Sequence, residues 1–184
     1  MRNFTHLNVH SDHSLLKGFG TIKEYVDKAK ENGQSAIALT DNNSMTGIYK
    51  FIKYCESSGI KPIPGITLNI APNGVDFKDT FTFDENNINL IPNRGANTTL
   101  TVLAKNQNGL RNLFKLIELS YEESNFFIVP RVDLNILKEY KNDLIIMSGS
   151  VESELGIRME LKQSQEFLDY IQNMKNIFGD NFFI

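Results

Sequence analysis

Residues 6–14 form the first of two polar stretches whose side chains could carry chemistry. They read HLNVHSDHS, and alternation along an extended strand would place His6, Asn8 and His10 on one face. Imidazole nitrogens gathered in this way could hold zinc or a similar transition metal. A single histidine at the end of a strand can equally be a polar residue that the following turn hydrogen-bonds, and this is the more common role.

Residues 39–44, which read LTDNNS, form the second polar stretch. Its aspartate, Asp41, follows a buried strand, where a carboxylate can ligate a metal or act as a base. It can also cap the helix that comes next, which is the more common outcome. His10 and Asp41 each fall at the carboxyl end of a predicted strand, and in α/β folds this is the edge where the chemistry sits.

The elements that would position these side chains alternate between strand and helix. Short apolar runs predict strands at residues 4–10, 35–40, 63–70, 100–104 and 143–148, and helical spacing predicts helices at 22–29, 48–55, 110–117, 134–140 and 167–178. Thr21 and Glu24 fit a capping box at the start of the first helix. The alternation indicates an α/β fold built on a parallel sheet or barrel.

Two stretches break this rhythm. Residues 72–97 mix Asn, Asp, Gly and Pro with single aromatics, which predicts a long loop insertion that projects from the core and could include a small hairpin. The last four residues, NFFI, are largely apolar and follow a helix stop, as they would at the start of another strand. We therefore expect residues 1–184 to be the truncated front part of a longer protein.

Composition excludes several classes of function. The 184 residues suit a single domain, and 41% of them are hydrophobic, which is enough to bury one core. The net charge is −3 and there is no basic run, so the chain is a poor candidate for binding DNA on its own. One cysteine excludes a disulfide framework and a cysteine-rich zinc module. No apolar run has membrane-spanning length, and the start lacks a signal-peptide pattern, so we expect a cytoplasmic location without membrane partners.

The two polar stretches belong to a longer series of segments: FTHL, VHSD, SLL, AIALTD, GIKPIPG, LTVLAKN, GLRNL, LIIMSG and FGDNF, in that order. This series resembles the PHP (polymerase and histidinol phosphatase) domain, in the form that begins the bacterial replicative DNA polymerase III alpha subunit. The resemblance covers nearly the whole chain. It implies a distorted (βα)7 barrel, which would be incomplete here.

The chain departs from the metal-binding pattern of this family at most positions. Where metal-competent members have His-x-His this chain has Asn8 and His10, and where they have Asp-His it has Asp41 and Asn42. The resemblance therefore implies vestigial metal-site positions at Asn8, His10, Asp41, Asn42, Thr67, Thr99 and Ser150. Only His10 and Asp41 keep the family's ligand types. We expect His10, Asp41, Thr67 and Ser148 to converge, with Asn8 and Asn42 beside them.

The replacements change the chemistry that the site could support. A catalytic zinc takes about three protein ligands and a water, whereas His10 and Asp41 supply two, and neutral amide and hydroxyl oxygens are weak ligands for a transition metal. We therefore expect no metal, no other cofactor and no catalytic residue in this part of the chain. The resemblance implies a metal-free structural and interaction scaffold. Its parent chain would be a DNA-directed DNA polymerase, a nucleotidyltransferase of DNA replication.

Two alternatives stay open at this point. The first is an active PHP phosphoesterase or 3'-5' proofreading exonuclease that uses zinc or manganese on His10, Asp41 and unconventional ligands. The second is a free-standing PHP phosphatase of small molecules, against which the polymerase-like segment GLRNL argues. The resemblance also implies partners: the palm and thumb of the same polymerase chain and, in some members, the proofreading exonuclease subunit. DNA would be reached only through the full polymerase.

Overall fold

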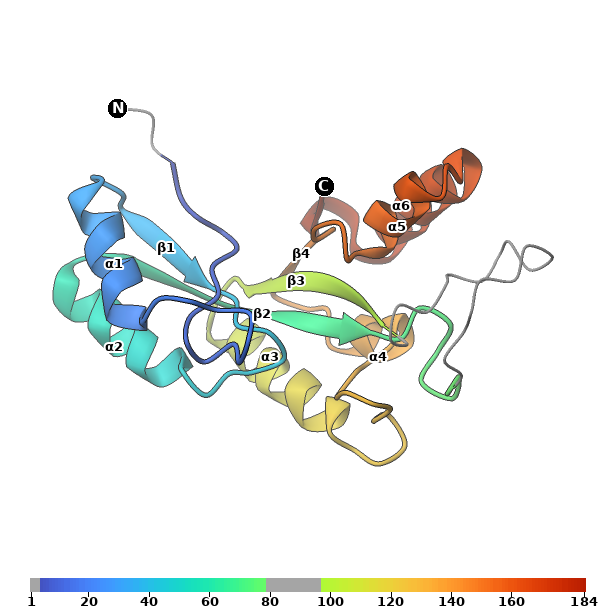
Figure 1. The fold of residues 1–184 in the computed structure, drawn as a ribbon, viewed down its shortest axis with the longest axis horizontal. Coiled ribbons are helices and arrows are strands. Elements are labelled where there is room, and N and C mark those ends of the chain that lie inside the picture. Colours follow the sequence, from blue (N-terminus) through green and yellow to red (C-terminus); the bar gives the residue numbers. More distant parts are fainter. Residues whose placement is uncertain (1–3, 79–96) are drawn as a thin grey trace.

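The sheet of the computed structural model, which describes residues 4–78 and 97–184, is mixed (Figure 1). Within these residues it has five strands in the order β1-β2-β3-β4-β5. The strands are β1 (Ala36–Leu39), β2 (Lys61–Ile70), β3 (Thr98–Ala104), β4 (Leu144–Met147) and β5 (Phe182–Phe183). The helices are α1 (Ile22–Glu31), α2 (Ile48–Ser58), α3 (Gln107–Ser120), α4 (Leu134–Glu139), α5 (Glu154–Glu160), α6 (Ser164–Phe178) and the 3-10 turn η1 (Gly179–Asn181). The predicted α/β class is confirmed.

Strand β3 runs against the direction of the other four. β1 and β2 are parallel and so are β4 and β5, whereas β3 is antiparallel to both β2 and β4. The expectation of a purely parallel sheet is therefore wrong at β3. The reason lies in the register: Ile70, the last residue of β2, pairs with Thr98, the first residue of β3. The chain therefore enters β3 at the same end of the sheet at which it leaves β2, and the connection needs no crossover.

The sheet is open in the described part of the chain, as an incomplete barrel would be. Its outer strands are β1 and β5. The predicted strand at residues 181–184 is present as β5, which pairs with β4. The predicted loop insertion at residues 72–97 lies between β2 and β3, although residues 79–96 fall outside the described part. Arg131, almost fully buried, holds the start of this segment by donating to the carbonyl oxygens of Val75 (2.7 Å) and Phe77 (3.0 Å).

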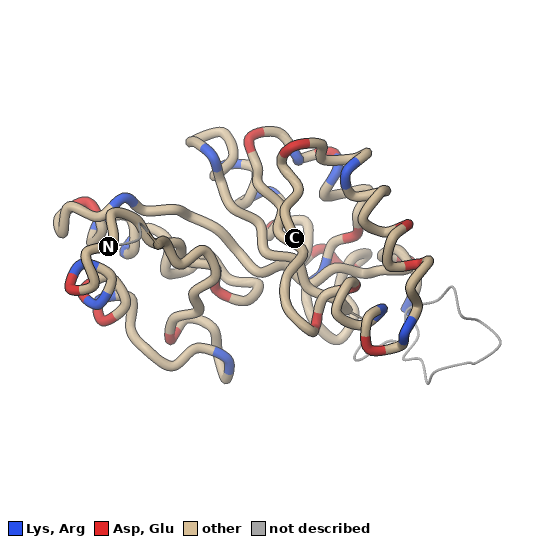
Figure 2. Tube along the Cα trace, turned by 90° about the horizontal axis from the view of Figure 1, so that it is seen from above, with Lys and Arg blue, Asp and Glu red and all other residues tan. Residues whose placement is uncertain are grey.

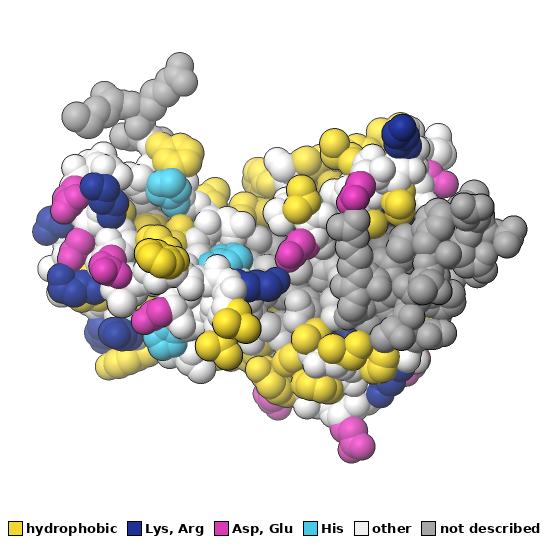
Figure 3. Space-filling model, in the orientation of Figure 1, with side chains coloured by type: hydrophobic (Ala, Val, Ile, Leu, Met, Phe, Trp, Pro, Cys, Tyr) yellow, Lys and Arg dark blue, Asp and Glu magenta, His cyan; other side chains and the backbone are white. Residues whose placement is uncertain are grey.

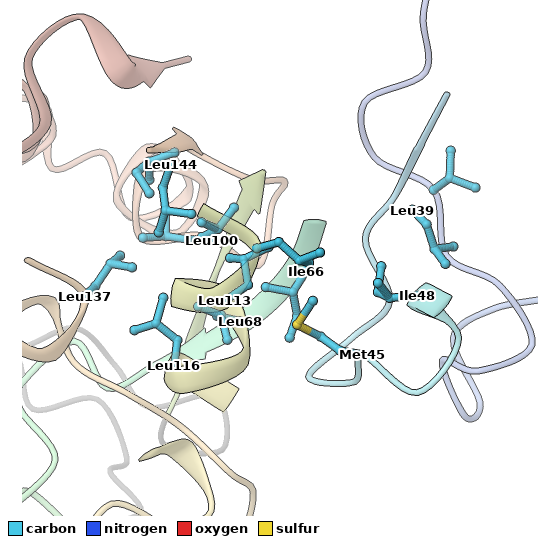
Figure 4. Packing of buried hydrophobic residues seen from close by; sticks show 14 of the residues in the cluster. Leu39, Met45, Ile48, Ile66, Leu68, Leu100, Leu113, Leu116, Leu137 and Leu144 are labelled. Carbon is cyan, nitrogen blue, oxygen red and sulfur yellow. The ribbon is translucent and has the colours of Figure 1, made fainter. Parts of the chain in front are cut away.

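The core lies on one face of β2 and β3, because alternate residues of these strands are apolar. Ile66, Leu68 and Ile70 of β2 point the same way as Leu100 and Val102 of β3, and all five are buried. Leu113 and Leu116 of α3 pack onto this face (Figure 4). The opposite face of the same strands carries Thr67, Thr99 and Thr101, and it contributes to the candidate site.

Two local predictions differ from the structure. Residues 4–10 form no strand, although the amides of Ala38 and Thr40 donate to the carbonyl oxygens of His6 and Val9 at 2.8 Å each. The return bond of a ladder is missing, because the Val9 amide donates to the Thr40 hydroxyl at 3.0 Å. Helix α5 was not predicted, since its seven residues include Gly156, which disfavours a helix interior, and carry little periodic signal. The capping box is confirmed, because Thr21 and Glu24 exchange hydrogen bonds between side chain and backbone. No helix in the described residues has the length and apolar character needed to cross a membrane.

Candidate functional site

A polar cavity of about 310 Å³ lies at the carboxyl ends of β1 and β4 and against the threonine face of β2 and β3. It is lined by Asn8, His10, Lys17, Asn42, Thr67, Thr99, Thr101, Gly149, Ser150 and Glu152. We call it the polar pocket. Six of the seven predicted site positions line it, and the exception is Asp41. Ser148, which we expected to converge there, does not line it, and its amide donates to the Phe183 carbonyl oxygen of β5 at 2.9 Å.

The imidazole of His10 is held between three neutral side chains. Its Nδ1 lies 2.7 Å from the Asn42 amide nitrogen, and its Nε2 lies 3.0 Å from Asn8 Oδ1 and 3.3 Å from Thr67 Oγ1. With the amides in these orientations, Asn42 donates to Nδ1, so the ring proton sits on Nε2 and is donated to Asn8. Both ring nitrogens are thus occupied by hydrogen bonds.

The surroundings of His10 favour this neutral form. Partial burial of the ring lowers the pKa of His10 below its usual value of 6.5, and the negative charge of Asp41 opposes this effect only in part. Asn8 is fixed in turn, because its Oδ1 also accepts from the Thr40 hydroxyl at 2.9 Å. The bonds among His10, Asn8, Asn42 and Thr40 form a continuous network of neutral groups.

Asp41 serves a different part of the molecule from the pocket. Its carboxylate, 2% exposed, accepts from the Ser11 amide (2.6 Å) and the Ser14 hydroxyl (2.7 Å) on one oxygen, and from the Ser11 hydroxyl (2.9 Å) on the other. It does not cap the next helix, since the N-cap of α2 is Gly47. Asp41 therefore anchors the loop that begins at Ser11. The sequence pattern gave no signal for this role beyond the serines at positions 11 and 14.

The remaining wall of the pocket is built from hydroxyl groups and one ion pair. Thr67 and Thr101 are cross-strand partners, with their hydroxyl oxygens 3.5 Å apart, and Thr99 lies one step along the same face. At the exposed mouth, Lys17 Nζ lies 3.2 Å from a carboxylate oxygen of Glu152. Sequence reasoning missed both members of this pair, because they are 135 positions apart and belong to loops.

These donors do not fit a transition metal. A zinc site needs about three nitrogen, sulfur or carboxylate ligands, and no three His, Cys, Asp or Glu residues cluster in that way within residues 4–78 and 97–184. His10 has both nitrogens engaged, and Asp41 is directed away from the pocket toward Ser11 and Ser14. Of the ionisable groups that do line the pocket, Lys17 is a cation and neutralises Glu152. The polar pocket can bind and orient a polar molecule through hydrogen bonds. Its described residues do not form a cluster of charged metal ligands.

The described residues thus form an α/β fold with a polar pocket at the ends of its strands. Residues 6–184 match the family model described as "PHP domain", so the chain belongs to the PHP domain family. Similar curated proteins are named DNA polymerase III subunit alpha. Those of Aquifex aeolicus, Treponema pallidum and Borreliella burgdorferi are 32%, 35% and 34% identical over 100%, 99% and 98% of this chain. The chain spans only 15% of the length of each of these relatives.

Two solved structures are similar to part of this chain. An amidohydrolase from Chromobacterium violaceum, described with bound sulfate and no metal, gives a TM-score of 0.41 at 17% identity, over 62% of this chain and 32% of that one. A putative metal-dependent phosphoesterase from Bifidobacterium adolescentis gives 0.41 at 14% identity, over 63% and 32%.

Proposed function

We propose that this chain is the PHP portion of a bacterial DNA polymerase III alpha subunit, in which it acts as a metal-free structural and interaction scaffold. The observation that carries the proposal is the network around His10. Asn8 and Asn42, at positions where metal-competent relatives of this type have histidines, bond directly to the imidazole and leave it no free nitrogen. A former ligand cluster has in this way become a set of mutually satisfied neutral groups.

The relatives support the polymerase part of the proposal. Matches of 32% to 35% identity to alpha subunits run the full length of this chain. The carboxylates that perform nucleotidyl transfer would belong to the 85% of those proteins that this chain does not align with. The partners would then be the palm and thumb of the same polypeptide, with the separate proofreading exonuclease subunit as a further candidate, and the setting would be the cytoplasm.

The charge distribution supports contact with DNA through the rest of the polymerase. Basic and acidic residues are interspersed along the described trace, and neither sign dominates one side (Figure 2). With a net charge of −3, the chain lacks the surplus of cations that neutralises phosphates when a domain binds DNA by itself.

A primer assay on the complete reading frame that contains this chain tests the proposal. We expect DNA-directed synthesis from the complete protein, and unchanged rates of synthesis and of mismatched-primer hydrolysis in His10→Ala and Asn42→Ala, with zinc or manganese supplied. His13→Ala is the matched control, because His13 is a histidine outside the polar pocket. Loss of metal-dependent primer hydrolysis in His10→Ala and Asn42→Ala, but not in the control, would show an active PHP enzyme instead.

A further inference from the structure

A second cavity, which we call the α1 cavity, lies between the extended residues 6–10, helix α1 and strand β1. Its volume is about 570 Å³, within the range of about 300–1,000 Å³ that small-molecule sites have. It shares Asn8, His10 and Lys17 with the smaller polar pocket. Histidine side chains gather on this part of the surface in Figure 3, on the side that carries α1 and α2 in Figure 1. The α1 cavity therefore has the size of a ligand site, and the proposed scaffold role makes no use of it.

The lysines and carboxylates around the α1 cavity favour an anionic occupant. Lys17 and Lys28 line it, whereas no Asp or Glu of residues 4–78 and 97–184 does. Each lysine bonds to a carboxylate outside the lining, Lys28 to Glu31 at 3.1 Å and Lys17 to Glu152 at 3.2 Å. Both ion pairs are exposed and therefore weak, so a phosphate with two negative charges can replace them.

Aromatic and apolar side chains form the other walls of the α1 cavity. Tyr25 of α1 is half-buried, and its hydroxyl accepts from the Gly20 amide at 3.3 Å, which holds the ring in place. Phe19 is 100% exposed, so its ring is free to cover an occupant. Ala29 and Ile37 are buried and provide apolar surface behind these rings. Such walls suit a planar aromatic group.

Gln34 supplies a hydrogen-bonding group that the described residues leave unsatisfied. Its side-chain oxygen is shielded from solvent and has no hydrogen-bond partner, while its backbone amide donates to the Ala29 carbonyl oxygen at 2.9 Å. An unpaired acceptor of this kind costs free energy, and most buried polar groups in proteins are paired. Gln34 lines the α1 cavity, so an N–H group of an occupant would satisfy its oxygen after a rotation of the terminal amide.

From these features we infer that the α1 cavity binds a nucleoside monophosphate. The phosphate lies against Lys17 and Lys28. The base stacks between Tyr25 and Phe19, and its N–H group bonds to Gln34. Lysine is a common phosphate binder, and aromatic side chains stack on nucleobases of every kind. Two cations match a single phosphate, whereas a nucleic-acid strand needs a longer row of them than this acidic chain has.

Photolabelling of the protein that the complete reading frame encodes tests the site, with 8-azidoadenosine 5'-monophosphate as the probe. Mass spectrometry of the digested protein should find the label within residues 4–37. Adenosine 5'-monophosphate should displace the label at a lower concentration than adenosine or inorganic phosphate, because each of these makes only part of the contacts. Label found only in other peptides would overturn the inference. Equal displacement by adenosine and its monophosphate would also overturn it, since the lysines would then contribute nothing.

Two variants with matched controls test the walls. Phe19→Ser and Lys28→Glu should each raise the concentration of adenosine 5'-monophosphate needed for displacement about fivefold or more, which corresponds to the loss of one stacking contact or the reversal of one nearby charge. Both residues are exposed, so the fold should tolerate these changes. The controls are Leu15→Ser in the same loop and Lys30→Glu on α1, which replace exposed residues outside the lining. Equal effects in variants and controls would contradict the site.

The remaining outcomes separate the occupant from the proposed function. Displacement by a single-stranded oligonucleotide at a lower concentration than by adenosine 5'-monophosphate would place a nucleic-acid strand in the cavity, and would overturn the choice of a mononucleotide. Rising salt should weaken displacement by adenosine 5'-monophosphate and leave that by adenosine unchanged. A failure of any of these tests leaves the proposed function intact, because a scaffold role requires no nucleotide beside α1.

Discussion

His10 and Asp41 have separate structural roles in this chain. The metal-binding pattern of the family would make both of them ligands. His10 is the centre of a neutral network with Asn8 and Asn42, and Asp41 is the anchor of the loop that starts at Ser11. Each arrangement satisfies buried polar groups, which would otherwise cost free energy. His10 and Asp41 are thus both engaged in hydrogen bonds within the fold.

Asp41→Asn should destabilise the chain by about 1–3 kcal/mol, because a neutral amide replaces a carboxylate that accepts three hydrogen bonds. Urea unfolding followed by circular dichroism measures this change. Asp12→Asn is the matched control: Asp12 is exposed in the same loop, and its substitution should stay within about 0.5 kcal/mol. Equal unfolding of the two variants would contradict an anchoring role for Asp41.

The titration of His10 gives a second prediction at this scale. Because burial lowers the pKa of His10 in the folded state, the unfolded chain takes up this proton first as the pH falls through 6.5. Stability should therefore decrease with acidification from 6.5 down to the folded pKa, and His10→Gln should lack this part of the decrease. The NMR titration of the His10 ring should have a midpoint below 6.5. A midpoint at or above that value would show that the ring favours the charged form.

The start of helix α3 and the residue before strand β4 approach each other closely at a glycine. Gly109 lies in the first turn of α3, and a Cβ added there would be 2.2 Å from the carbonyl oxygen of Asp143, just before β4. The same carbonyl oxygen accepts from the Lys105 amide at 2.9 Å, so it is not free to move away. Close packing here sets the distance between α3 and the sheet.

Gly109→Ala should consequently lower the free energy of unfolding by about 1–3 kcal/mol, which is the cost of overpacking. In an unhindered helix the same change stabilises by up to about 1 kcal/mol, so the sign is diagnostic. Thermal or urea unfolding measures it. Gln107→Ala, at an exposed position of the same turn, should have little effect. A stabilising Gly109→Ala would mean that α3 begins farther from β4 than this structure has it.

Elements that are determined by neighbouring residues were predicted correctly, whereas features that depend on distant residues were missed. Local signals such as the Thr21 capping box, the apolar strands and the stripe of α3 act within a few residues, and they are present as predicted. The direction of β3 and the loss of the strand at residues 4–10 depend on pairings with distant parts of the chain. At the site, the positions taken from the family pattern predicted most of the residues that line the pocket. Asp41 is the exception, because its carboxylate bonds to Ser11 and Ser14, which the pattern does not indicate.

At the scale of the whole molecule, residues 4–78 and 97–184 form an open sheet with a polar pocket on one side, and Lys17 of the loop of residues 11–20 lines that pocket. The ion pair of Lys17 and Glu152 links this loop to the segment after β4 at the pocket mouth. As an exposed pair it adds little stability.

The zinc content of the purified chain tests the account most directly. After incubation with excess zinc and dialysis, mass spectrometry should find no stoichiometric metal in the natural chain. The variant Asn8→His/Asn42→His/Thr67→Glu should retain about one zinc per chain, since it places three ligands around His10 at positions that now lie 2.7–3.3 Å from it. Stoichiometric zinc in the natural chain that His10→Ala abolishes would contradict the metal-free scaffold.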